Sequence, residues 1–504
     1  MLAKIFSGAI VGLDCELIEV EVDIGQGKPH FFLVGLAAKE VDESKDRIRA
    51  ALLNVGVKLP NQRVTVNLAP ANIRKEGSGY DVPISVGMLK AGGYINTDVT
   101  DSLFYGELSL SGRLRPVKGA LSLAMMAQER GFKKIFLPAD NAAEAALIDQ
   151  LKVFPVKNLQ QLISHLSGEE QINEYILKEE ETTNNHAFSI DFADIKGHDH
   201  AKRALEIAAA GGHNVLLSGP PGSGKTLLAK SFPSILPPMT KQEKLEVTRI
   251  YSVAGLLNQK IGLIAERPFR KPHHTSSSAA LVGGGNIPRP GEISLSHRGV
   301  LFLDEFPEFS RFALEALRQP LEDGIITISR ASASLQFPAS FILIAAMNPC
   351  PCGNFTDRDK KCVCSPMKIL NYQKKISGPL LDRIDLHLEV PRLDFDKLKQ
   401  ITPKENSKKV KERVIKARQI QNLRFTNTPT VTNSEMSAKQ VEIFCQYDRP
   451  AEEIIKKAVD KMNLSPRSFH RLLKVSRTIA DLAGKETIDS LHVAEALQYR
   501  TRVE

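Results

Sequence analysis

The chain has 504 residues, enough for about three domains of ordinary size. Hydrophobic residues make up 42% and charged residues 25%, and 67 Lys and Arg against 58 Asp and Glu give a net charge of +9. This composition excludes a wholly disordered chain, a collagen and a small disulfide-linked protein. No apolar run approaches the roughly 20 residues that span a bilayer, so we expect a cytoplasmic protein without a membrane partner. The positive surplus permits a polyanionic partner.

Residues 1–167 predict a first domain of mixed α and β structure. The apolar stretch 5–12 is followed by acidic residues and shows no cleavage pattern, which indicates a strand rather than a signal peptide. Further strands are expected at 16–24, 64–68 and 135–138, and helices at 43–54 and 120–129. Residues 168–187 are acidic and polar without a sustained apolar period, so they predict a linker. An exposed helix is the alternative.

A second domain is expected over residues 188–393. Its short apolar strand, 214–218, precedes a glycine-rich loop and a helix, and two more apolar strands follow at 299–303 and 341–347. Continuous apolar strands of this kind are typical of a parallel sheet that is covered on both faces. The fold class is therefore α/β.

The glycine-rich loop fits the pattern G-x-x-x-x-G-K-[ST] over its eight residues, Gly219, Pro220, Pro221, Gly222, Ser223, Gly224, Lys225 and Thr226. Glycines let the backbone wrap closely around phosphate oxygens, and the N–H groups of a helix start point at the anion. Lys225 would neutralise the β and γ phosphates of ATP, and the hydroxyl of Thr226 would bind Mg²⁺.

Two acids and an amide follow the next two strands. Asp304 and Glu305 come at the end of an apolar strand, where ligands of open α/β sheets bind. Asp304 would hold Mg²⁺, and Glu305 would orient and polarise the attacking water. Asn348 follows the third strand and would position that water and touch the γ-phosphate, although Asn-Pro also opens turns.

Four cysteines lie within fifteen residues, in the pattern C-x-C-x9-C-x-C. These four residues, Cys350, Cys352, Cys362 and Cys364, could enclose one Zn²⁺ tetrahedrally. The C-x-C spacing is tighter than that of the usual zinc knuckle. A redox pair and reduced structural thiols therefore remain as alternatives.

Residues 394–504 predict a helical third domain rich in Lys and Arg. The stretch 404–424 holds eight basic and two acidic residues, a surplus of six positive charges. It predicts either a solvated helix face or a contact with nucleic-acid phosphates. A second basic cluster comprises Arg267, Arg270, Lys271, His273 and His274. The γ-phosphate, a subunit interface and DNA all remain open as its target.

The chain resembles the AAA+ ATPases, and more narrowly the magnesium-chelatase-like ComM/YifB family of bacterial proteins. The resemblance covers nearly the whole chain and rests on the phosphate loop and on four further motifs: DFADIKGH at 191–198, RPFRKPHHT at 267–275, ALVGGG at 280–285 and ISGPLLDRID at 376–385. It implies an AAA+ core with a helix-2 insertion, a helical lid of the magnesium-chelatase C-terminal type, and a pre-sensor hairpin at 324–330 and 334–337 that faces a central pore.

The resemblance also implies roles for two arginines and for the assembly. Arg383 would be the finger that reaches a neighbour's ATP, and Arg467 the second sensor of the lid; a surface salt bridge is the alternative for each. A finger acting between subunits requires a ring, expected to be a hexamer. The implied function is an ATP-driven motor on DNA, a helicase or branch-migration enzyme in homologous recombination during natural transformation. A magnesium-chelatase motor subunit, a protein-remodelling ATPase and a non-hydrolysing regulatory module are the alternatives.

Residues 1–167 resemble the proteolytic domain of Lon, which has a ribosomal-S5-like α+β fold. The matching motifs are KEGSGYD at 75–81 and GELSLSGRLRPVKG at 106–119. The serine of the Lon dyad falls at Gly79 and its lysine at about Leu121, so neither catalytic group is present. A shifted dyad of Ser78 and Lys118 is the alternative to a noncatalytic module. Chelatase motor subunits lack such a module, which argues against the chelatase function.

Overall fold

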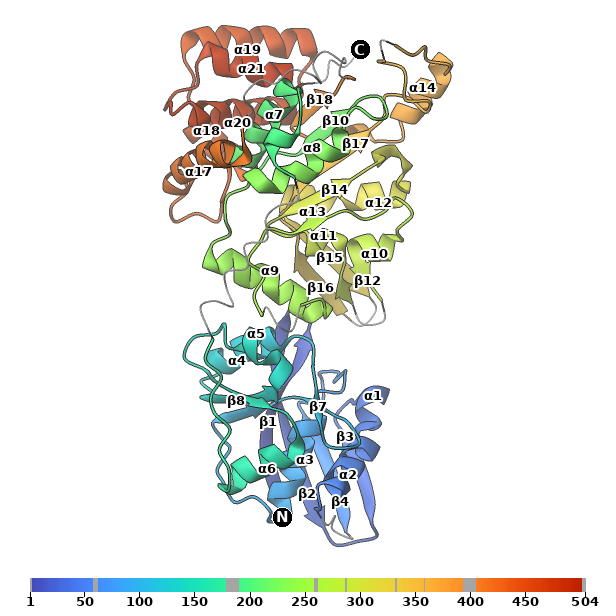
Figure 1. Ribbon diagram of the computed structural model, residues 1–504, viewed down its shortest axis with the longest axis vertical. Coiled ribbons are helices and arrows are strands. Elements are labelled where there is room, and N and C mark those ends of the chain that lie inside the picture. The colour runs from blue at the N-terminus through green and yellow to red at the C-terminus, as the bar shows by residue number, and fades with distance from the viewer. Residues whose placement is uncertain are drawn as a thin grey trace.

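The computed structural model of the protein describes residues 2–57, 62–177, 190–257, 262–285, 288–330, 333–357, 359–392 and 405–500. The molecule is elongated, with the N-terminal domain at one end and the central core and helical lid toward the other (Figure 1). No helix in these ranges combines the length and the apolar character needed to cross a bilayer.

The N-terminal domain is built on a seven-stranded mixed sheet in the order β3-β4-β2-β1-β5-β8-β9. Its strands are β1 (Leu2–Val11), β2 (Asp14–Gly25), β3 (His30–Val34), β4 (Arg63–Ala69), β5 (Ser102–Phe104), β8 (Lys134–Pro138) and β9 (Lys152–Val156), beside a small ribbon of β6 (Glu107–Leu108) and β7 (Leu114–Arg115). Its helices are α1 (Lys39–Asp42), α2 (Ser44–Asn54), α3 (Asp81–Ala91), α4 (Ala120–Glu129), α5 (Ala142–Ala145) and α6 (Leu159–Ser167).

Both faces of this sheet are buried at β8, whereas one face of β2 carries Glu19, Glu21 and Asp23, which are partly buried or exposed. Successive strand residues point to opposite faces, so Phe136 of β8 joins the apolar cluster around α2, α3 and α6, whereas Ile135 and Leu137 join the cluster around α4 and α5. The strands and helices predicted for this domain are confirmed. Nearly all of their predicted ends lie within two residues of the observed ones.

The predicted linker is not a free segment where the structure describes it. Residues 168–177 form no helix, which rules out the exposed-helix alternative there. Ile172 is 6% exposed, and the N–H of Tyr175 donates to the carbonyl oxygen of Val153 at 2.8 Å, so the segment lies along β9. Residues 178–187 of the predicted linker lie outside the described residues.

The central core holds a five-stranded parallel sheet in the order β11-β14-β17-β10-β18. Its strands are β10 (Val215–Ser218), β11 (Phe269–Arg270), β14 (Val300–Leu303), β17 (Ile342–Met347) and β18 (Leu386–Glu389), and its helices include α7 (Asp199–Gly211), α8 (Lys225–Ser231), α9 (Lys241–Ala254), α12 (Arg311–Ala316), α13 (Arg318–Asp323), α14 (Pro366–Gln373) and α15 (Gly378–Leu381). Alternate residues of β14 enter different apolar clusters, as predicted for a sheet that is buried on both faces.

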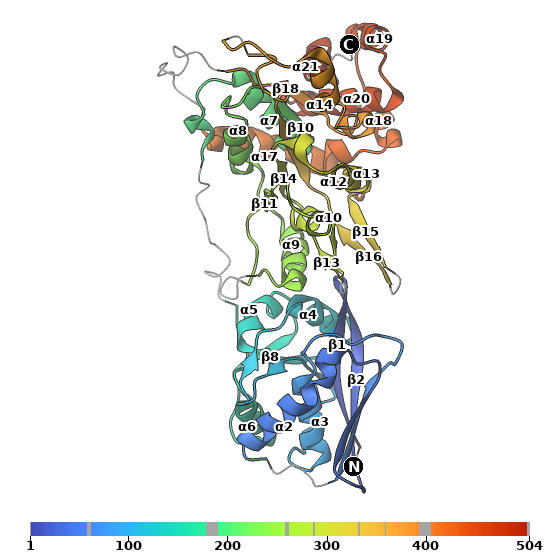
Figure 2. The ribbon, with the colours of Figure 1, turned by 90° about the vertical axis from the view of Figure 1, so that its right-hand side faces the viewer.

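Two hairpins project from this core. A short one, β12 (Gly283–Gly284) with β13 (Arg289–Pro290), separates α10 (Ser278–Val282) from α11 (Glu292–Leu295), where the resemblance implies the helix-2 insertion. The other, β15 (Ile325–Arg330) with β16 (Ala333–Pro338), confirms the predicted hairpin. It extends toward the turn between β1 and β2 (Figure 2), where Leu13 packs into the same apolar cluster as Leu335.

The lid is helical, as predicted, over α17 (Ser407–Arg424), α18 (Ala438–Phe444), α19 (Arg449–Met462), α20 (Pro466–Leu482) and α21 (Ser490–Gln498). Its interior is tied by a buried ion pair in which Arg424 and Arg477 both bind the carboxylate of Asp481. The predicted start of this domain, 394–404, lies outside the described residues.

Candidate ATP site

The phosphate loop follows β10 directly and leads into α8. Gly222 and Gly224 have φ values of +77° and +90°, which side chains other than glycine rarely adopt. A Cβ atom at Gly219 would lie 2.2 Å from the carbonyl oxygen of Val390, so the backbone just after β18 also requires glycine there. The loop is therefore fixed in a conformation that presents its N–H groups ahead of α8.

Lys225 is the first residue of α8, and its side chain folds back over the loop. Its ammonium donates to the carbonyl oxygens of Gly219 at 2.6 Å and Pro220 at 2.9 Å, and to Oδ1 of Asn348 at 3.3 Å. Burial lowers the pKa of Lys225 to about 8, because the charged form loses hydration. A triphosphate at this position would restore the favourable environment of the charge.

Asp304, Thr226 and Asn348 meet at the carboxyl edge of the sheet, as predicted. In the sheet register Ser218 pairs with Met347 and Leu303 with Ala345, so the three strands end side by side. The hydroxyl of Thr226 donates to Oδ2 of Asp304 at 3.2 Å. The pair supplies the oxygen ligands that Mg²⁺ prefers.

Each of the two strand-end acids contacts a residue of the basic cluster 267–274. The ammonium of Lys271 lies 3.0 Å from Oδ2 of Asp304, and Nδ1 of His274 lies 3.1 Å from Oε2 of Glu305. Glu305 itself has a φ of +52°, an uncommon conformation for a residue with a side chain. Sequence reasoning left the target of this cluster open, because contacts between separate loops have no local signature.

The rest of that cluster has structural partners. Arg267 donates to the carbonyl oxygens of Pro237 and Arg298 at 2.7 Å, and Arg270 binds Glu292. His273 contacts its neighbour Thr275 at 2.8 Å. Of the five residues in this cluster, Lys271 and His274 are therefore the two that contact the strand-end acids.

Arg383 and Arg467 lie at the opposite edge of the sheet from the phosphate loop. Asn214, immediately before β10, donates to the carbonyl oxygen of Arg383 at 3.2 Å, whereas the phosphate loop follows the other end of that strand. Both arginines bind the same carboxylate, that of Glu322 at the end of α13. In this chain they are therefore close to each other and remote from Lys225.

The four cysteine sulfurs converge. The Sγ–Sγ distances are 3.4 Å for Cys350–Cys352, 3.7 Å for Cys350–Cys362 and 3.6 Å for Cys352–Cys362. The four Sγ atoms, that of Cys364 included, all lie within 4.8 Å of one another, and none of these cysteines forms a disulfide. The fold thus brings together the quartet that the spacing singled out.

A parallel sheet in this order, with a phosphate loop, two strand-end acids and an amide at one edge, defines a P-loop ATPase of the AAA+ type. Three family models match: magnesium chelatase subunit ChlI over residues 191–398, its C-terminal part over 404–500, and a second ChlI model over 20–141. Competence protein ComM of Haemophilus influenzae is 44% identical over the whole chain and 98% of its own length. The chain belongs to the ComM/YifB family of magnesium-chelatase-like ATPases.

Two further relatives mark the breadth of this likeness. The uncharacterised protein YifB of Escherichia coli is 40% identical over 99% of this chain and 97% of its own length. A magnesium-chelatase 67 kDa subunit of Chlorobaculum parvum is 29% identical over 32% of this chain and 23% of its own. Because a ChlI model matches 20–141, the N-terminal domain alone does not argue against a chelatase function.

The basic stretch of the lid forms α17, and its arginines face the protein. Arg413 binds Glu206 and Glu405, Arg418 donates to the carbonyl oxygen of Ala209 at 2.9 Å, and Arg424 binds Asp481. The exposed lysines of this helix are Lys408, Lys409 and Lys416. These contacts favour a packed and solvated helix over a dedicated phosphate-binding face.

The positions that correspond to the Lon dyad are filled by packing. A Cβ atom at Gly79 would lie 2.1 Å from the ring of Tyr105, and Leu121 is fully buried. Ser78 donates to Glu107, and Lys118 packs on Gly255, so neither has the other as a partner in the contacts of the described residues.

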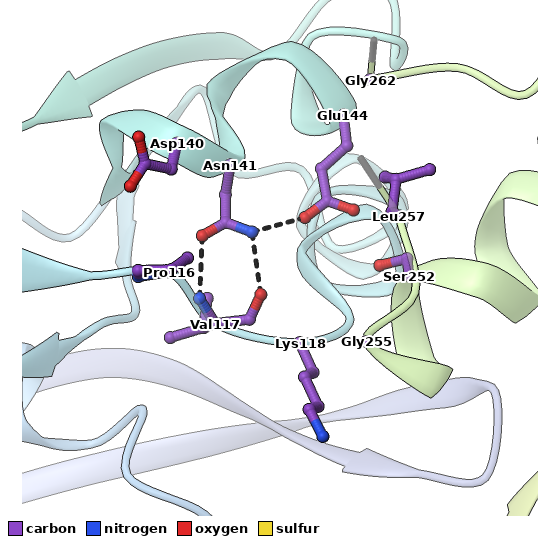
Figure 3. A pocket seen from close by; sticks show the side chains of 10 residues that line it. All are labelled: Pro116, Val117, Lys118, Asp140, Asn141, Glu144, Ser252, Gly255, Leu257 and Gly262. Atoms are coloured by element: carbon purple, nitrogen blue, oxygen red, sulfur yellow. Dashed lines mark hydrogen bonds between the residues drawn. The ribbon is translucent and has the colours of Figure 1, made fainter. Parts of the chain in front are cut away.

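A pocket of about 200 Å³ lies between the N-terminal domain and the end of α9 (Figure 3). It is lined by Pro116, Val117, Lys118, Asp140, Asn141, Glu144, Ser252, Gly255, Leu257 and Gly262. The amide of Asn141 donates to Oε1 of Glu144 at 2.7 Å. In the described part of the chain, Oε2 of Glu144 and Oγ of Ser252 are buried without a hydrogen-bond partner.

We expect Glu144→Gln to become more stable, relative to the wild type, as the pH rises. Burial raises the pKa of Glu144 above its ordinary value of 4.5, so the carboxyl group's contribution to stability is full below that value and is lost as the pH rises through the raised pKa. Gln keeps the acceptor of Asn141 but does not titrate. Thermal melting between about pH 5 and about pH 8 should show a growing Tm difference, by roughly 2–4 °C for each kcal/mol.

The matched control is Glu129→Gln at the exposed end of α4. The same melting series on this variant measures the effect of exchanging Glu for Gln at an exposed position. A Tm difference for Glu144→Gln that does not change with pH would show that Glu144 does not titrate as its burial requires.

Proposed function

We propose that the chain is one subunit of an ATP-driven ring motor that acts on DNA, as a helicase or branch-migration enzyme in homologous recombination during natural transformation. The observation that carries the motor part is the separation of catalytic groups. Lys225, Asp304 and Glu305 stand at one edge of the sheet, and Arg383 with Arg467 stands at the other.

This separation favours action between subunits. Parallel strands place the phosphate loop after Ser218 and Arg383 before Leu386, at opposite ends of paired strands. A guanidinium at that end cannot serve its own phosphate loop without crossing the sheet. A neighbouring subunit can bring the two edges together, and a closed ring, which we propose to be a hexamer, does this for every subunit.

The DNA part of the proposal rests on the family and on the shape of the core. One relative is named a competence protein, and the β15–β16 hairpin projects from the core as the resemblance implies for a pore element. Backbone phosphates are the target that such a hairpin would bind, because they are reached without reading bases.

The chelatase alternative is favoured by one observation, the descriptions of the matching family models. The likeness to a chelatase subunit covers only 32% of the chain, so we rank this function second. A protein-remodelling ATPase ranks with it, since the catalytic site alone does not choose the substrate.

The proposed cofactors are ATP and Mg²⁺. Lys225 would bind the phosphates, and Thr226 and Asp304 would bind the metal. Glu305 and Asn348 would position the attacking water. We also propose Zn²⁺ on the four cysteines. The N-terminal domain is proposed as a Lon-like but noncatalytic module for assembly or partner binding, in a protein that acts in the cytoplasm.

DNA binding should be nearly independent of sequence and should weaken steeply with salt. With Z phosphates neutralised, log K should fall by about 0.9Z per log unit of salt on duplex and about 0.7Z on single strands. ATP should favour binding, and hydrolysis should displace a strand of forked DNA or move a four-way branch. A fluorescent forked substrate, titrated with and without ATP across a salt series, measures the salt dependence, the effect of ATP and the strand displacement.

Lys225→Ala should bind DNA without any stimulation by ATP, whereas Lys230→Ala, an exposed lysine on the same helix, should behave as the wild type. If ATP turnover responds to no DNA and no strand is displaced, the motor acts on another substrate, and the chelatase or remodelling function takes its place.

A further inference from the structure

The four-cysteine cluster has the dimensions of a tetrahedral metal–thiolate site. With Zn–S bonds of about 2.3 Å, the edges of a ZnS₄ tetrahedron are about 3.8 Å long. The three Sγ–Sγ distances of 3.4–3.7 Å come close to that edge. A disulfide would need about 2.05 Å, and no pair in the cluster approaches it.

The described residues of the loop that carries these cysteines, 350–357 and 359–364, form little apolar core, although Asp357 is paired with Arg392. The loop's large apolar side chains, Phe355 and Val363, are 53% and 85% exposed. A short segment without an apolar core needs a covalent or metal link to keep one conformation. The sulfurs join the segment after β17, at Cys350 and Cys352, to the segment before α14, at Cys362 and Cys364.

The first of these segments is in direct contact with the ATP site. Cys350 comes two residues after Asn348. At Gly353 an added Cβ atom would lie 2.5 Å from Cδ of Pro221 in the phosphate loop and 3.8 Å from Cγ of Asn348. The N–H of Gly353 donates to the carbonyl oxygen of Cys350 at 2.9 Å, which closes the turn against that loop.

We infer that a zinc ion on Cys350, Cys352, Cys362 and Cys364 acts as a positioning element of the ATP site, because it fixes the turn that supports Pro221 and Asn348. This inference rests on the proposed function in one respect, that the site binds ATP. Loss of the metal releases the turn. The phosphate loop then loses its support at Pro221, and Asn348 loses its fixed position beside Lys225.

The test compares three variants of the full-length protein. Cys362→Ser with Cys364→Ser removes two ligands at partly exposed positions, Cys364→His keeps a Cys₃His set that also binds zinc, and Cys15→Ala changes a cysteine of the N-terminal domain outside the cluster. Elemental analysis measures zinc per chain, a fluorescent ATP analogue with Mg²⁺ measures affinity, and steady-state kinetics separate KM from kcat.

We expect about one zinc per chain in the wild type, in Cys364→His and in Cys15→Ala, all with equal nucleotide affinity. The double Ser variant should lose zinc and bind nucleotide about 10- to 100-fold more weakly, the range typical of lost support around a metal site, with kcat reduced as well. Release of zinc from the wild type by a thiol-reactive mercurial and a chelator should reproduce this loss if the variant folds poorly.

A native protein without zinc, or with iron instead, would overturn the inference. So would zinc loss that leaves nucleotide affinity and kcat unchanged. If the wild type hydrolyses no ATP or ignores DNA, the proposed function fails, but zinc content and nucleotide affinity still decide whether the metal supports the site.

Discussion

Glu305→Gln should bind Mg·ATP with wild-type affinity and fail to turn it over. The substitution keeps the shape of the side chain but removes the base that polarises the attacking water, which is worth about 10²–10⁴-fold in rate. Thr226, Asp304 and Lys225, which hold the phosphates and the metal, are unchanged. Single-turnover kinetics measure the loss of hydrolysis, and nucleotide retention after gel filtration measures binding. The variant should accumulate as a nucleotide-bound oligomer.

The matched control is Glu308→Gln, three residues further on, where an exposed carboxylate pairs with Lys375. It makes the same change of charge near the site and should turn over at the wild-type rate. Wild-type turnover by Glu305→Gln would show that Glu305 is not the residue that activates water.

Arg383→Ala should leave nucleotide affinity nearly intact and lower turnover, by up to the roughly 10³–10⁵-fold that arginine fingers contribute in well-studied NTPases. The guanidinium lies at the sheet edge remote from its own phosphate loop, so its loss should slow ATP hydrolysis in the neighbouring subunit. Mixing Arg383→Ala with Glu305→Gln subunits should partly restore hydrolysis, because some interfaces then combine an intact acid with an intact arginine. No recovery at any mixing ratio would count against a finger between subunits.

Glu322→Gln is the control that separates this role from a structural one. It removes the carboxylate that holds both Arg383 and Arg467 within the chain but leaves both guanidiniums in place. If Arg383 matters only for that internal ion pair, Glu322→Gln should impair turnover as much as Arg383→Ala does. If Arg383 instead acts on the ATP of a neighbouring subunit, Glu322→Gln should hydrolyse ATP at a nearly normal rate.

The elements that sequence predicted well are those with a local signature. The phosphate loop, the strand ends at Asp304 and Asn348, and the hairpin alternation at 324–337 are each fixed by neighbouring residues. The shared contact of Arg383 and Arg467 with Glu322 joins three separate segments, and no periodic pattern in the sequence predicts it. The same holds for Lys271 and His274 at the strand-end acids.

The remaining differences come from tertiary packing that overrides composition. An acidic, polar run predicted a free linker, yet 168–177 lies along β9, because Ile172 is buried and Tyr175 bonds to its backbone. The basic surplus of α17 predicted either a solvated helix face or a contact with nucleic-acid phosphates, and buried or partly buried acids within the protein bind two of its arginines. Charge counts cannot distinguish internal from external partners.

The contact between Leu13 and the β15–β16 hairpin joins the N-terminal domain to the tip of the hairpin. Leu13 lies in the hairpin's own apolar cluster, and Arg249 of α9 braces the same turn through Asp14 at 2.6 Å. β2, which starts at this turn, has twelve residues and is thus about 40 Å long, so a tilt of about 10° at the hairpin would sweep its far end through about 7 Å. If the domain follows the hairpin as one body, a small change in the hairpin's angle becomes a larger displacement at the outer end of the molecule.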